Sequence, residues 1–340
     1  MQYLSRQTVL GERLQFVYRV PGKPPQILDF ARCTDALGAV ARERGEQPTA
    51  HDCMPPSAVL PHTLMDLFAS GEKWWTYSLQ VERLCREYLS PASIAACVMP
   101  GEPLPVIPRP PSVRDFYAFE THVKRARARR GLEMVPEWYD FPVFYFSNPC
   151  ALLADGAVVK KPVATRKLDF ELEVAVIVRR PVRDVSPSEA LTCLAGLTIL
   201  NDWSARDIQA QEVKVGLGPA KGKDFATSLG PVLVTFDELA SRVSDLSDGH
   251  GPRIDLPMRA YVNGDVITTG NLSDLHYTIG DLVARASSDV TLYPGEVLGT
   301  GTVGGGCLLE WGEDAHRWLD AGDEVKLEVE AVGALTNRIG

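Results

Sequence analysis

Glu171 and Glu173, two glutamates one residue apart, are the residues whose types and spacing most directly suggest chemistry. They lie in segment 168–178, which is rich in branched apolar residues and predicts a β-strand. Because side chains alternate faces along a strand, both carboxylates would point the same way, where they repel each other and are poorly solvated. A divalent cation would relieve both problems, since hard cations prefer oxygen ligands. The alternative is the solvated outer face of an edge strand.

A polar segment, 201–209, follows a predicted apolar strand. Strand ends that run into polar turns are common places for chemistry, and Asp202 could supply a third carboxylate to a metal. Alternatively, Asp202 or Ser204 caps the helix that follows. In that helix Arg206 and Gln209, three residues apart, would share a face. They could hydrogen-bond a substrate oxygen, or pair with Asp202 and solvent.

The segment after residue 111 predicts a helix with Ser112 as its N-cap and Asp115 in its first turn. In such a helix Asp115 and His122, seven residues apart, would share a face. A carboxylate there suits a metal, and a histidine suits proton transfer near neutral pH, although a single helical histidine is also commonly a surface or packing residue. The basic run 124–130 fits either a solvated face or a group that catches a carboxylate. The apolar side of this helix would carry Phe116, Phe119 and Val123.

The composition is that of an ordinary globular protein. The 340 residues are 45% hydrophobic and 23% charged, which suggests about two domains. A formal net charge of −9 argues against a general binder of nucleic acid or acidic membranes. No apolar run approaches the roughly 20 residues that cross a bilayer, and no signal peptide is recognisable. The seven cysteines are widely spaced without a CxxC, which predicts buried free thiols in a reducing cytoplasm: Cys33, Cys53, Cys85, Cys97, Cys150, Cys193 and Cys307.

The proline-rich segment 99–111 predicts an extended connector between two domains, 1–108 and 109–340. The first domain is expected to be small and mixed, with short apolar runs at 14–20 and 58–60 and a helix at 77–89. The second is expected to be mainly β. Its predicted strands are 158–161, 172–179, 230–235, 258–262, 297–302 and 324–331, and its predicted helices are 187–195 and 279–286. The pair Asn263 and Gly264 predicts a two-residue hairpin turn.

Five motifs occur in one order: RDFYAFETH, FELEVAV, NDWSARDIQ, GPAKGKDFATSLGP and GTGTVGGGCLLEW. Together they resemble the fumarylacetoacetate hydrolase (fumarylacetoacetase) family, from Val113 to the C-terminus. The combination of ELE, NDWSARD and GKxFxTS in one chain is highly specific. The small first domain and the connector also resemble the longer, two-domain members in layout. The resemblance implies an α+β, mainly β fold: a rolled mixed β-sheet catalytic domain with a small N-terminal domain, usually assembled as a homodimer.

The resemblance also implies a divalent cation held by carboxylates. The matching ligands are Asp115, Glu171, Glu173 and Asp202. A set without thiolate or imidazole independently favours a hard cation, Mg²⁺ or Ca²⁺ with Mn²⁺ also accommodated, over zinc. Lys223 and Thr227 match the family's loop next to the metal, and Thr227 is where a second cation could bind.

Other positions match the family's catalytic and substrate-binding residues. His122 matches the general base, and Glu310 matches the acid that orients it. The polar residues around the reacting carbonyl match Arg206, Gln209 and Lys223. The substrate-contacting positions match Tyr117, Tyr145, Thr302 and one arginine, Arg130 or its neighbour Arg129. Val213 stands where animal members carry a tyrosine at the substrate, so the resemblance does not fix the exact substrate.

These residues predict a metal-dependent hydrolase that cleaves a carbon–carbon bond in a small β-diketo acid, such as fumarylacetoacetate or an acylpyruvate. His122, held by Glu310, would remove a proton from water, and the polar residues would stabilise the oxyanion. The alternative is a decarboxylase or isomerase of an oxaloacetate-like 2-oxo acid, which would use the same metal–enolate chemistry with water excluded. A non-catalytic ligand-binding protein with a bound metal is a third class, disfavoured because no expected catalytic position is missing.

Overall fold

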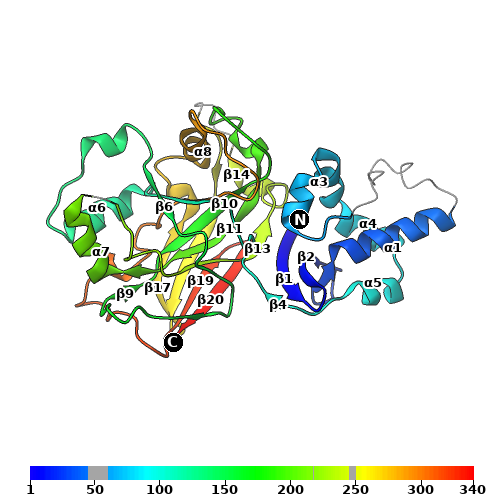
Figure 1. The fold of residues 1–340 in the computed structure, drawn as a ribbon, viewed down its shortest axis with the longest axis horizontal. Coiled ribbons are helices and arrows are strands. Elements are labelled where there is room, and N and C mark those ends of the chain that lie inside the picture. The colour runs from blue at the N-terminus through cyan, green and yellow to red at the C-terminus, as the bar shows by residue number, and fades with distance from the viewer. Residues whose placement is uncertain (45–59, 217, 245–249) are drawn as a thin grey trace.

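The computed structural model describes residues 1–44, 60–216, 218–244 and 250–340. Its centre is an 11-stranded sheet in the order β3-β2-β1-β13-β11-β10-β18-β5-β6, with β4 beside β1 and β7 beside β13 (Figure 1). Its strands are β1 (Gln2–Thr8), β2 (Gly11–Tyr18), β3 (Gln26–Asp29), β4 (Glu102–Pro103), β5 (Val113–Phe116), β6 (Phe144–Ser147), β7 (Leu152–Leu153), β10 (Leu172–Val178), β11 (Leu194–Asp202), β13 (Thr227–Val234) and β18 (Val297–Gly299). The mainly β, α+β fold class is therefore confirmed.

Strand β10 lies in the middle of this sheet, between β11 and β18, and all its residues are buried. Its even-numbered side chains, such as Val174, join one hydrophobic core, and Ala175 and Ile177 join another on the opposite face. Burial on both faces explains why the sequence here is a nearly continuous apolar run. Glu173 therefore stands on an internal strand, and the interpretation as an edge strand's solvated face is wrong.

A second, five-stranded sheet packs over one face of the first and shares its core. Its order is β17-β16-β19-β20-β8, with bounds β17 (Asp265–Asn271), β16 (Pro257–Val262), β19 (Glu324–Val329), β20 (Gly333–Ile339) and β8 (Val158–Val159). Val262 pairs directly with Asp265, which confirms the two-residue turn at Asn263 and Gly264; both residues have positive φ, 53° and 90°. Two short ladders complete the β structure: β9 (Leu168–Asp169) with β12 (Ser204–Ala205), and β14 (Val243–Ser244) with β15 (Arg253–Ile254).

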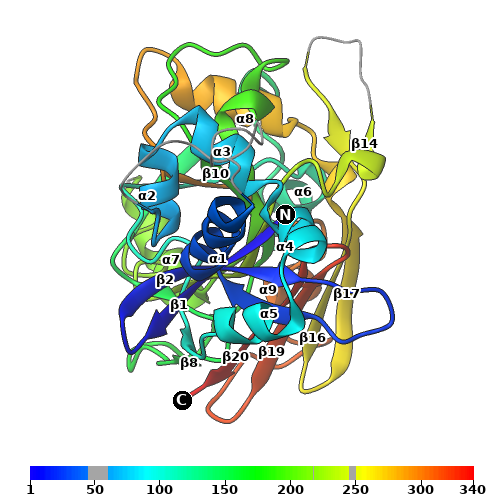
Figure 2. The same ribbon diagram turned by 90° about the vertical axis from the view of Figure 1, so that its right-hand side faces the viewer.

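The N-terminal helices cluster beside β1–β3, as Figure 2 shows from that end of the molecule. They are α1 (Phe30–Glu43), α2 (Leu64–Ala69), α3 (Glu72–Ser78), α4 (Val81–Tyr88) and α5 (Pro91–Cys97). The single helix expected at 77–89 is wrong, because the chain turns at Leu79 and Gln80 and both short helices then bury apolar residues in one core. Strand β1 pairs antiparallel with β13, so one sheet contains strands from before and after the proline-rich segment. The division into 1–108 and 109–340 stays a prediction.

The later helices are α6 (Glu120–Ala128), α7 (Arg206–Glu212), α8 (Ile279–Ser287) and α9 (Leu308–Trp311). Thr278 and Asp281 form a capping box at the start of α8, and the helix expected at 279–286 is confirmed. The helix expected at 187–195 is wrong. Only a 3-10 turn, Ala190–Cys193, forms there, because Leu194 and Ala195 are drawn into the buried strand β11.

The described cysteines are all free, as predicted, and five of them are buried. Cys150 is the exception, because it lies in an exposed turn where its backbone N–H donates to the side chain of Asn148. Cys53 lies outside the described residues. Within the described ranges, no helix has the length and apolar character needed to span a bilayer.

Candidate active site

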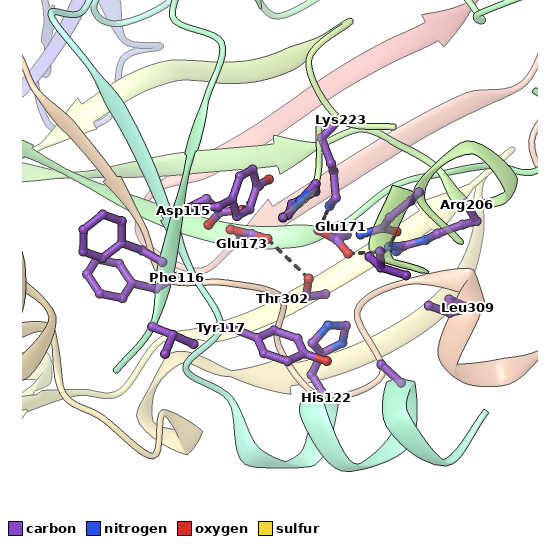
Figure 3. Close-up of a pocket in the computed structure, with 18 of the residues that line it drawn as sticks. Asp115, Phe116, Tyr117, His122, Glu171, Glu173, Arg206, Lys223, Thr302 and Leu309 are labelled. Atoms are coloured by element: carbon purple, nitrogen blue, oxygen red, sulfur yellow. Dashed lines mark hydrogen bonds and ion pairs between the residues drawn. The ribbon is translucent and has the colours of Figure 1, made fainter. Parts of the chain in front are cut away.

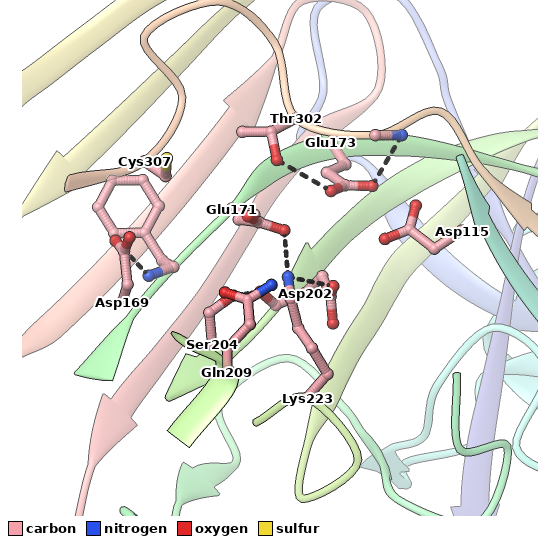
Figure 4. A network of polar contacts seen from close by, with 12 residues as sticks. Asp115, Asp169, Glu171, Glu173, Asp202, Ser204, Gln209, Lys223, Thr302 and Cys307 are labelled. Atoms are coloured by element: carbon pink, nitrogen blue, oxygen red, sulfur yellow. Dashed lines mark hydrogen bonds and ion pairs between the residues drawn. The ribbon is translucent and has the colours of Figure 1, made fainter. Parts of the chain in front are cut away.

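Four carboxylates from neighbouring strands meet at one end of the central sheet. They are Asp115 on β5, Glu171 just before β10, Glu173 on β10 and Asp202 at the end of β11. One oxygen of each lies within 4.8 Å of the others, and all four residues are buried. Figure 4 shows them converging. The prediction that Glu171 and Glu173 point the same way is confirmed, since both reach this cluster.

Asp115 reaches the cluster from a strand, so the helix expected from Ser112 onward is wrong. Residues 113–116 are buried between β18 and β6, and this pairing outweighs the local helix-capping pattern. Helix α6 begins only at Glu120 and carries His122. Asp115 and His122 therefore lie on different elements rather than on one helix face.

Two cationic side chains are buried against these carboxylates. Lys223 Nζ lies 2.5 Å from Glu171 Oε2 and 2.6 Å from Asp202 Oδ2. The Arg206 guanidinium donates to Asp169 Oδ2 at 2.7 Å and to Glu171 Oε1 at 2.8 Å. Arg206 thus pairs with Asp169 and Glu171 rather than with Asp202. It also donates to Gln209 Oε1 at 3.1 Å, so the shared face of α7 that their spacing predicted is confirmed.

Asp202 does not cap helix α7. The N-cap of this helix is Ala205, which makes no side-chain capping hydrogen bond, and the Ser204 hydroxyl donates to the Asp202 carbonyl. The capping alternative for Asp202 and Ser204 is therefore wrong. The side chain of Asp202 is left to interact with Lys223 and Tyr145.

The electrostatics of the cluster depend on which carboxylate is next to a cation. Burial, followed by the charge of Asp202, raises the pKa of Asp115 well above its usual value. Burial and Asp115 likewise raise the pKa of Glu173. Burial also acts on Glu171, but Lys223 and Arg206 outweigh it and hold the pKa of that carboxyl below its usual range. The Asp115 side of the cluster therefore lacks positive charge.

The donor set fits a hard divalent cation. Asp115 Oδ1 and Asp202 Oδ1 are buried and have no hydrogen-bond partner among the described residues. Buried polar atoms are rarely left unsatisfied, and these two lie beside other carboxylate oxygens. Gly299 keeps the backbone close, because a Cβ there would lie 2.5 Å from Asp115 Oδ1. An all-oxygen set suits Mg²⁺, Ca²⁺ or Mn²⁺.

A histidine–glutamate pair lies beside the carboxylates. His122 Nδ1 is 2.6 Å from Glu310 Oε1, and the Gly305 N–H donates to Glu310 Oε2 at 2.6 Å. Because a carboxylate oxygen accepts, Nδ1 carries the proton and Nε2 is left as a proton acceptor. The ring of Tyr117 packs edge-on against His122, with 5.3 Å between ring centroids.

A cavity of about 400 Å³ connects the two groups, and Figure 3 shows His122 on α6 facing the glutamates. This volume suits a small organic ligand. The predicted site residues that line it are Asp115, Tyr117, His122, Arg130, Tyr145, Glu171, Glu173, Arg206, Gln209, Lys223 and Thr302. Asp202, Thr227 and Glu310 stand behind these residues and do not line the cavity.

Residues 112–340 match the family model described as "Fumarylacetoacetate (FAA) hydrolase C-terminal". The chain belongs to the fumarylacetoacetate hydrolase family. Two curated relatives represent two activities. The chain is 29% identical to the fumarylacetoacetase of Oryza sativa over 243 residues, 56% of each chain. It is 28% identical to the oxaloacetate tautomerase YisK of Bacillus subtilis over 202 residues, 59% of this chain and 62% of that one. It thus spans little more than half the length of these relatives.

Solved structures share the fold of this chain. A putative HpcE protein from Mycobacterium smegmatis is 24% identical, with a TM-score of 0.65, and the match covers 100% of this chain and 99% of that one. Fumarylpyruvate hydrolase from Pseudomonas aeruginosa, solved in complex with Mn²⁺ and pyruvate, is 19% identical with a TM-score of 0.53 over 70% of this chain and 90% of that one. These structures show the fold, and the two curated relatives above are enzymes with different activities, a fumarylacetoacetase and an oxaloacetate tautomerase.

Of the residues matched to the family's substrate positions, Tyr145 and Thr302 bind the carboxylates, whereas Tyr117 packs beside His122. Tyr145 Oη donates to Asp202 and, at 3.3 Å, to Asp115, and Thr302 Oγ1 donates to Glu173 at 3.3 Å. These two hydroxyls therefore contact the carboxylate cluster. Burial, only partly opposed by Arg130, raises the pKa of Tyr117 to about 12.

The structure also separates the two candidate arginines. Arg130 lines the cavity, whereas Arg129 donates to the carbonyls of Glu310 and Trp311 at 3.1 and 2.5 Å. Val213 lines the cavity at the position where the resemblance noted a tyrosine in animal members. Thr227 is paired with Asp202 in the β11–β13 ladder, and its hydroxyl lies 3.4 Å from that of Ser147.

Sequence reasoning missed Asp169. This fully buried carboxylate accepts from Arg206 and from the backbone N–H groups of Leu308 and Leu309, at 2.8 and 3.1 Å, at the start of α9. The available signal was its spacing, since Asp169, Glu171 and Glu173 alternate along one extended segment.

Proposed function

We propose that this protein is a metal-dependent hydrolase that cleaves a carbon–carbon bond in a β-diketo acid, such as fumarylacetoacetate or an acylpyruvate. The observation that carries the proposal is His122, which lies 2.6 Å from Glu310 and lines the same cavity as Asp115, Glu171 and Glu173 of the carboxylate cluster. Hydrolysis of a diketone needs a base for water and stabilisation of a developing oxyanion, and the cavity has residues for both. Membership of the family supports this reaction class.

The cation belongs to the same proposal. Its ligands would be Asp115, Glu171, Glu173 and Asp202, and its identity Mg²⁺ or Ca²⁺, with Mn²⁺ also accommodated. When bound, it would polarise the substrate carbonyl and offset negative charge on oxygen. Support comes from the all-oxygen ligand set and from the Mn²⁺ in the Pseudomonas aeruginosa fumarylpyruvate hydrolase. A second cation at Thr227 stays a prediction.

The proton steps fall to His122. Its Nε2 takes a proton from water, and the resulting hydroxide attacks the carbonyl carbon. Glu310 holds Nδ1–H and stabilises the imidazolium that forms. When the carbon–carbon bond breaks, the electron pair stays on the leaving carbon. His122 returns its proton there, which restores the neutral ring.

The oxyanion would be stabilised by residues that the structure holds in place. Arg206 is fixed by Asp169 and Glu171, and Gln209 is fixed by Arg206. Lys223 is bound to Glu171 and Asp202, so its charge lies beside the cluster. A well-placed donor of this kind contributes about 3 kcal/mol to the transition state.

Replacement of the base tests the proposal. His122→Ala should abolish the release of two acids from fumarylacetoacetate or acylpyruvates. It should leave the Mg²⁺ affinity by calorimetry unchanged, because His122 is not among the four carboxylates. The control is His62→Ala, which removes an exposed histidine from the N-terminal part of the chain, outside the candidate site. A fully active His122→Ala protein would refute the role of the base.

A second candidate is tautomerisation, isomerisation or decarboxylation of an oxaloacetate-like 2-oxo acid. The observation that favours it is the match to an oxaloacetate tautomerase at nearly the identity of the match to a fumarylacetoacetase. Water labelled with oxygen-18 separates the reactions: hydrolysis places the label in a product carboxylate, decarboxylation releases CO₂, and tautomerisation changes only the keto–enol ratio. A homodimer located in the cytoplasm completes the proposal, and mass measurement in solution tests the dimer.

A further inference from the structure

A second group of metal-ligating side chains lies directly behind the cavity wall. His122, Cys307 and Glu310 are all buried, and one ligand atom of each lies within 4.8 Å of the other two. Cys307 Sγ is 3.6 Å from Glu310 Oε1, the same oxygen that contacts His122 Nδ1 at 2.6 Å. The reaction proposed above gives the Cys307 thiol no task.

These three ligands differ in kind from the four carboxylates. A thiol, an imidazole and one carboxylate form the type of set that binds Zn²⁺ through three protein ligands, with the fourth position open to water. Of the three ligands, only His122 lines the cavity, so its imidazole connects this site to the cavity. Ligand atoms around a tetrahedral zinc are separated by roughly 3.3–3.7 Å, given the usual zinc–ligand bond lengths. The Cys307–Glu310 distance already fits, and the His122–Glu310 distance would have to widen by less than about 1 Å.

The surroundings of the thiol also favour a cation. Burial first, and then the charges of Asp169, Glu310 and Glu171, raise the pKa of Cys307 well above its usual value, with Arg206 opposing them. An excess of carboxylates around a buried thiol keeps it protonated when no metal is bound. The same carboxylates attract a dication, whose charge allows the sulfur to bind as a thiolate.

We propose that His122, Cys307 and Glu310 form a binding site for a thiophilic divalent cation such as Zn²⁺, separate from the four-carboxylate site. As the sulfur–zinc bond forms, the S–H bond breaks and its proton leaves to solvent, without any electron transfer. Either ring nitrogen of His122 can bind with the same consequence for the base. Binding through Nε2 would use its lone pair. Binding through Nδ1 would break the Nδ1–H bond, and a proton taken up from solvent at Nε2 would balance the one released from Nδ1.

Zinc at this site should therefore inhibit the enzyme. This consequence rests on the proposed function, because it assumes that His122 acts as the base. The existence of the site does not, since a thiolate–metal bond can be observed without any turnover. The experiment below keeps these two claims apart.

The test uses the full-length protein saturated with Mg²⁺, so that the carboxylates are occupied. Co²⁺ is then added as a spectroscopic substitute for Zn²⁺, and the thiolate-to-cobalt charge-transfer band is followed in the near ultraviolet. The wild-type protein should develop this band and should bind one equivalent of Zn²⁺ by calorimetry. Cys307→Ser should lose the band and need at least tenfold more Zn²⁺ for half-inhibition. Cys150→Ser, which removes an exposed thiol, is the matched control and should keep the band.

Absence of the band from the wild-type protein, or its persistence in Cys307→Ser, would overturn the proposal. Cadmium NMR of the wild-type protein gives an answer even if Cys307→Ser does not fold, because sulfur ligation shifts the resonance far from that of an all-oxygen site. A protein that shows sulfur ligation but no hydrolysis would keep this site and refute the hydrolase proposal instead.

Discussion

Replacement of Glu310 by glutamine should slow turnover because the amide cannot satisfy both neighbours of the carboxylate. One oxygen faces His122 Nδ1 at 2.6 Å and the other accepts from the Gly305 N–H at 2.6 Å. A glutamine NH₂ group placed at Gly305 would oppose two donors. Placed at His122, it would force the ring proton onto Nε2 and leave no base toward the cavity.

The magnitude follows from the hydrogen bond that is lost. A hydrogen bond to a charged group contributes about 1.5–3 kcal/mol, and each 1.4 kcal/mol changes a rate about tenfold. Glu310→Gln should therefore lower kcat by roughly 10- to 100-fold. The Mg²⁺ affinity should stay the same, because Glu310 is not one of the four carboxylates.

The assay is kcat and KM on an acylpyruvate, with metal affinity and Tm measured on the same preparation. Glu313→Gln is the matched control, since Glu313 lies three residues further along and pairs with Lys167 at the surface. An unchanged kcat for Glu310→Gln would refute the orienting role. A loss of metal affinity equal to the loss of kcat would show that Glu310 acts on the cation rather than on His122.

Two further predictions concern metal affinity and acid stability. Gly299→Ala should weaken Mg²⁺ binding by about 10- to 100-fold. The alanine Cβ would lie 2.5 Å from Asp115 Oδ1 and would displace that ligand. Calorimetry measures the affinity, and an unchanged value would contradict the prediction. The second prediction concerns Asp323, whose carboxylate accepts hydrogen bonds from Arg317 and Asn263. Arg317 above all holds the pKa of Asp323 below its usual value. The contribution of Asp323 to the free energy of unfolding is therefore fully present above about pH 4, and it is lost as the pH falls through the lower pKa of the folded state. Asp323→Asn should thus lower the free energy of unfolding by about 1–2 kcal/mol at pH 7, and by less below pH 3. Denaturant titrations at the two pH values measure both effects. An equal loss at both pH values would refute the stabilising role of the ionised Asp323 carboxylate.

Local periodicity was enough to predict one half of the carboxylate cluster. The alternation of Glu171 and Glu173 along a strand depends only on backbone geometry, and Asp202 stands at the end of the neighbouring strand β11. Asp115 could not be placed in this way. Its position depends on the pairing of β5 with β18, two segments far apart in the sequence, and only the family resemblance connected them.

The prediction of a helix from Ser112 failed for a related reason. A serine followed by an acid three residues later is the local pattern of a helix start, and Val113–Phe116 have no local feature that overrides it. Burial of these four residues between β18 and β6 decides the structure instead. The choice between Arg129 and Arg130 was equally non-local, because it depends on where α9 lies against α6.

Asp169 explains why the carboxylate cluster and the His122–Glu310 pair keep their relative positions. On one side it holds Arg206, which in turn holds Glu171. On the other side it accepts from the backbone N–H groups of residues 308 and 309 at the start of α9, the helix that carries Glu310. A shift of α9 would therefore break hydrogen bonds to a buried carboxylate, and each such loss is costly. One shared residue thus supports both His122, through α9 and Glu310, and the proposed metal ligands. In the proposed reaction it would hold the base and the carboxylates at a fixed separation.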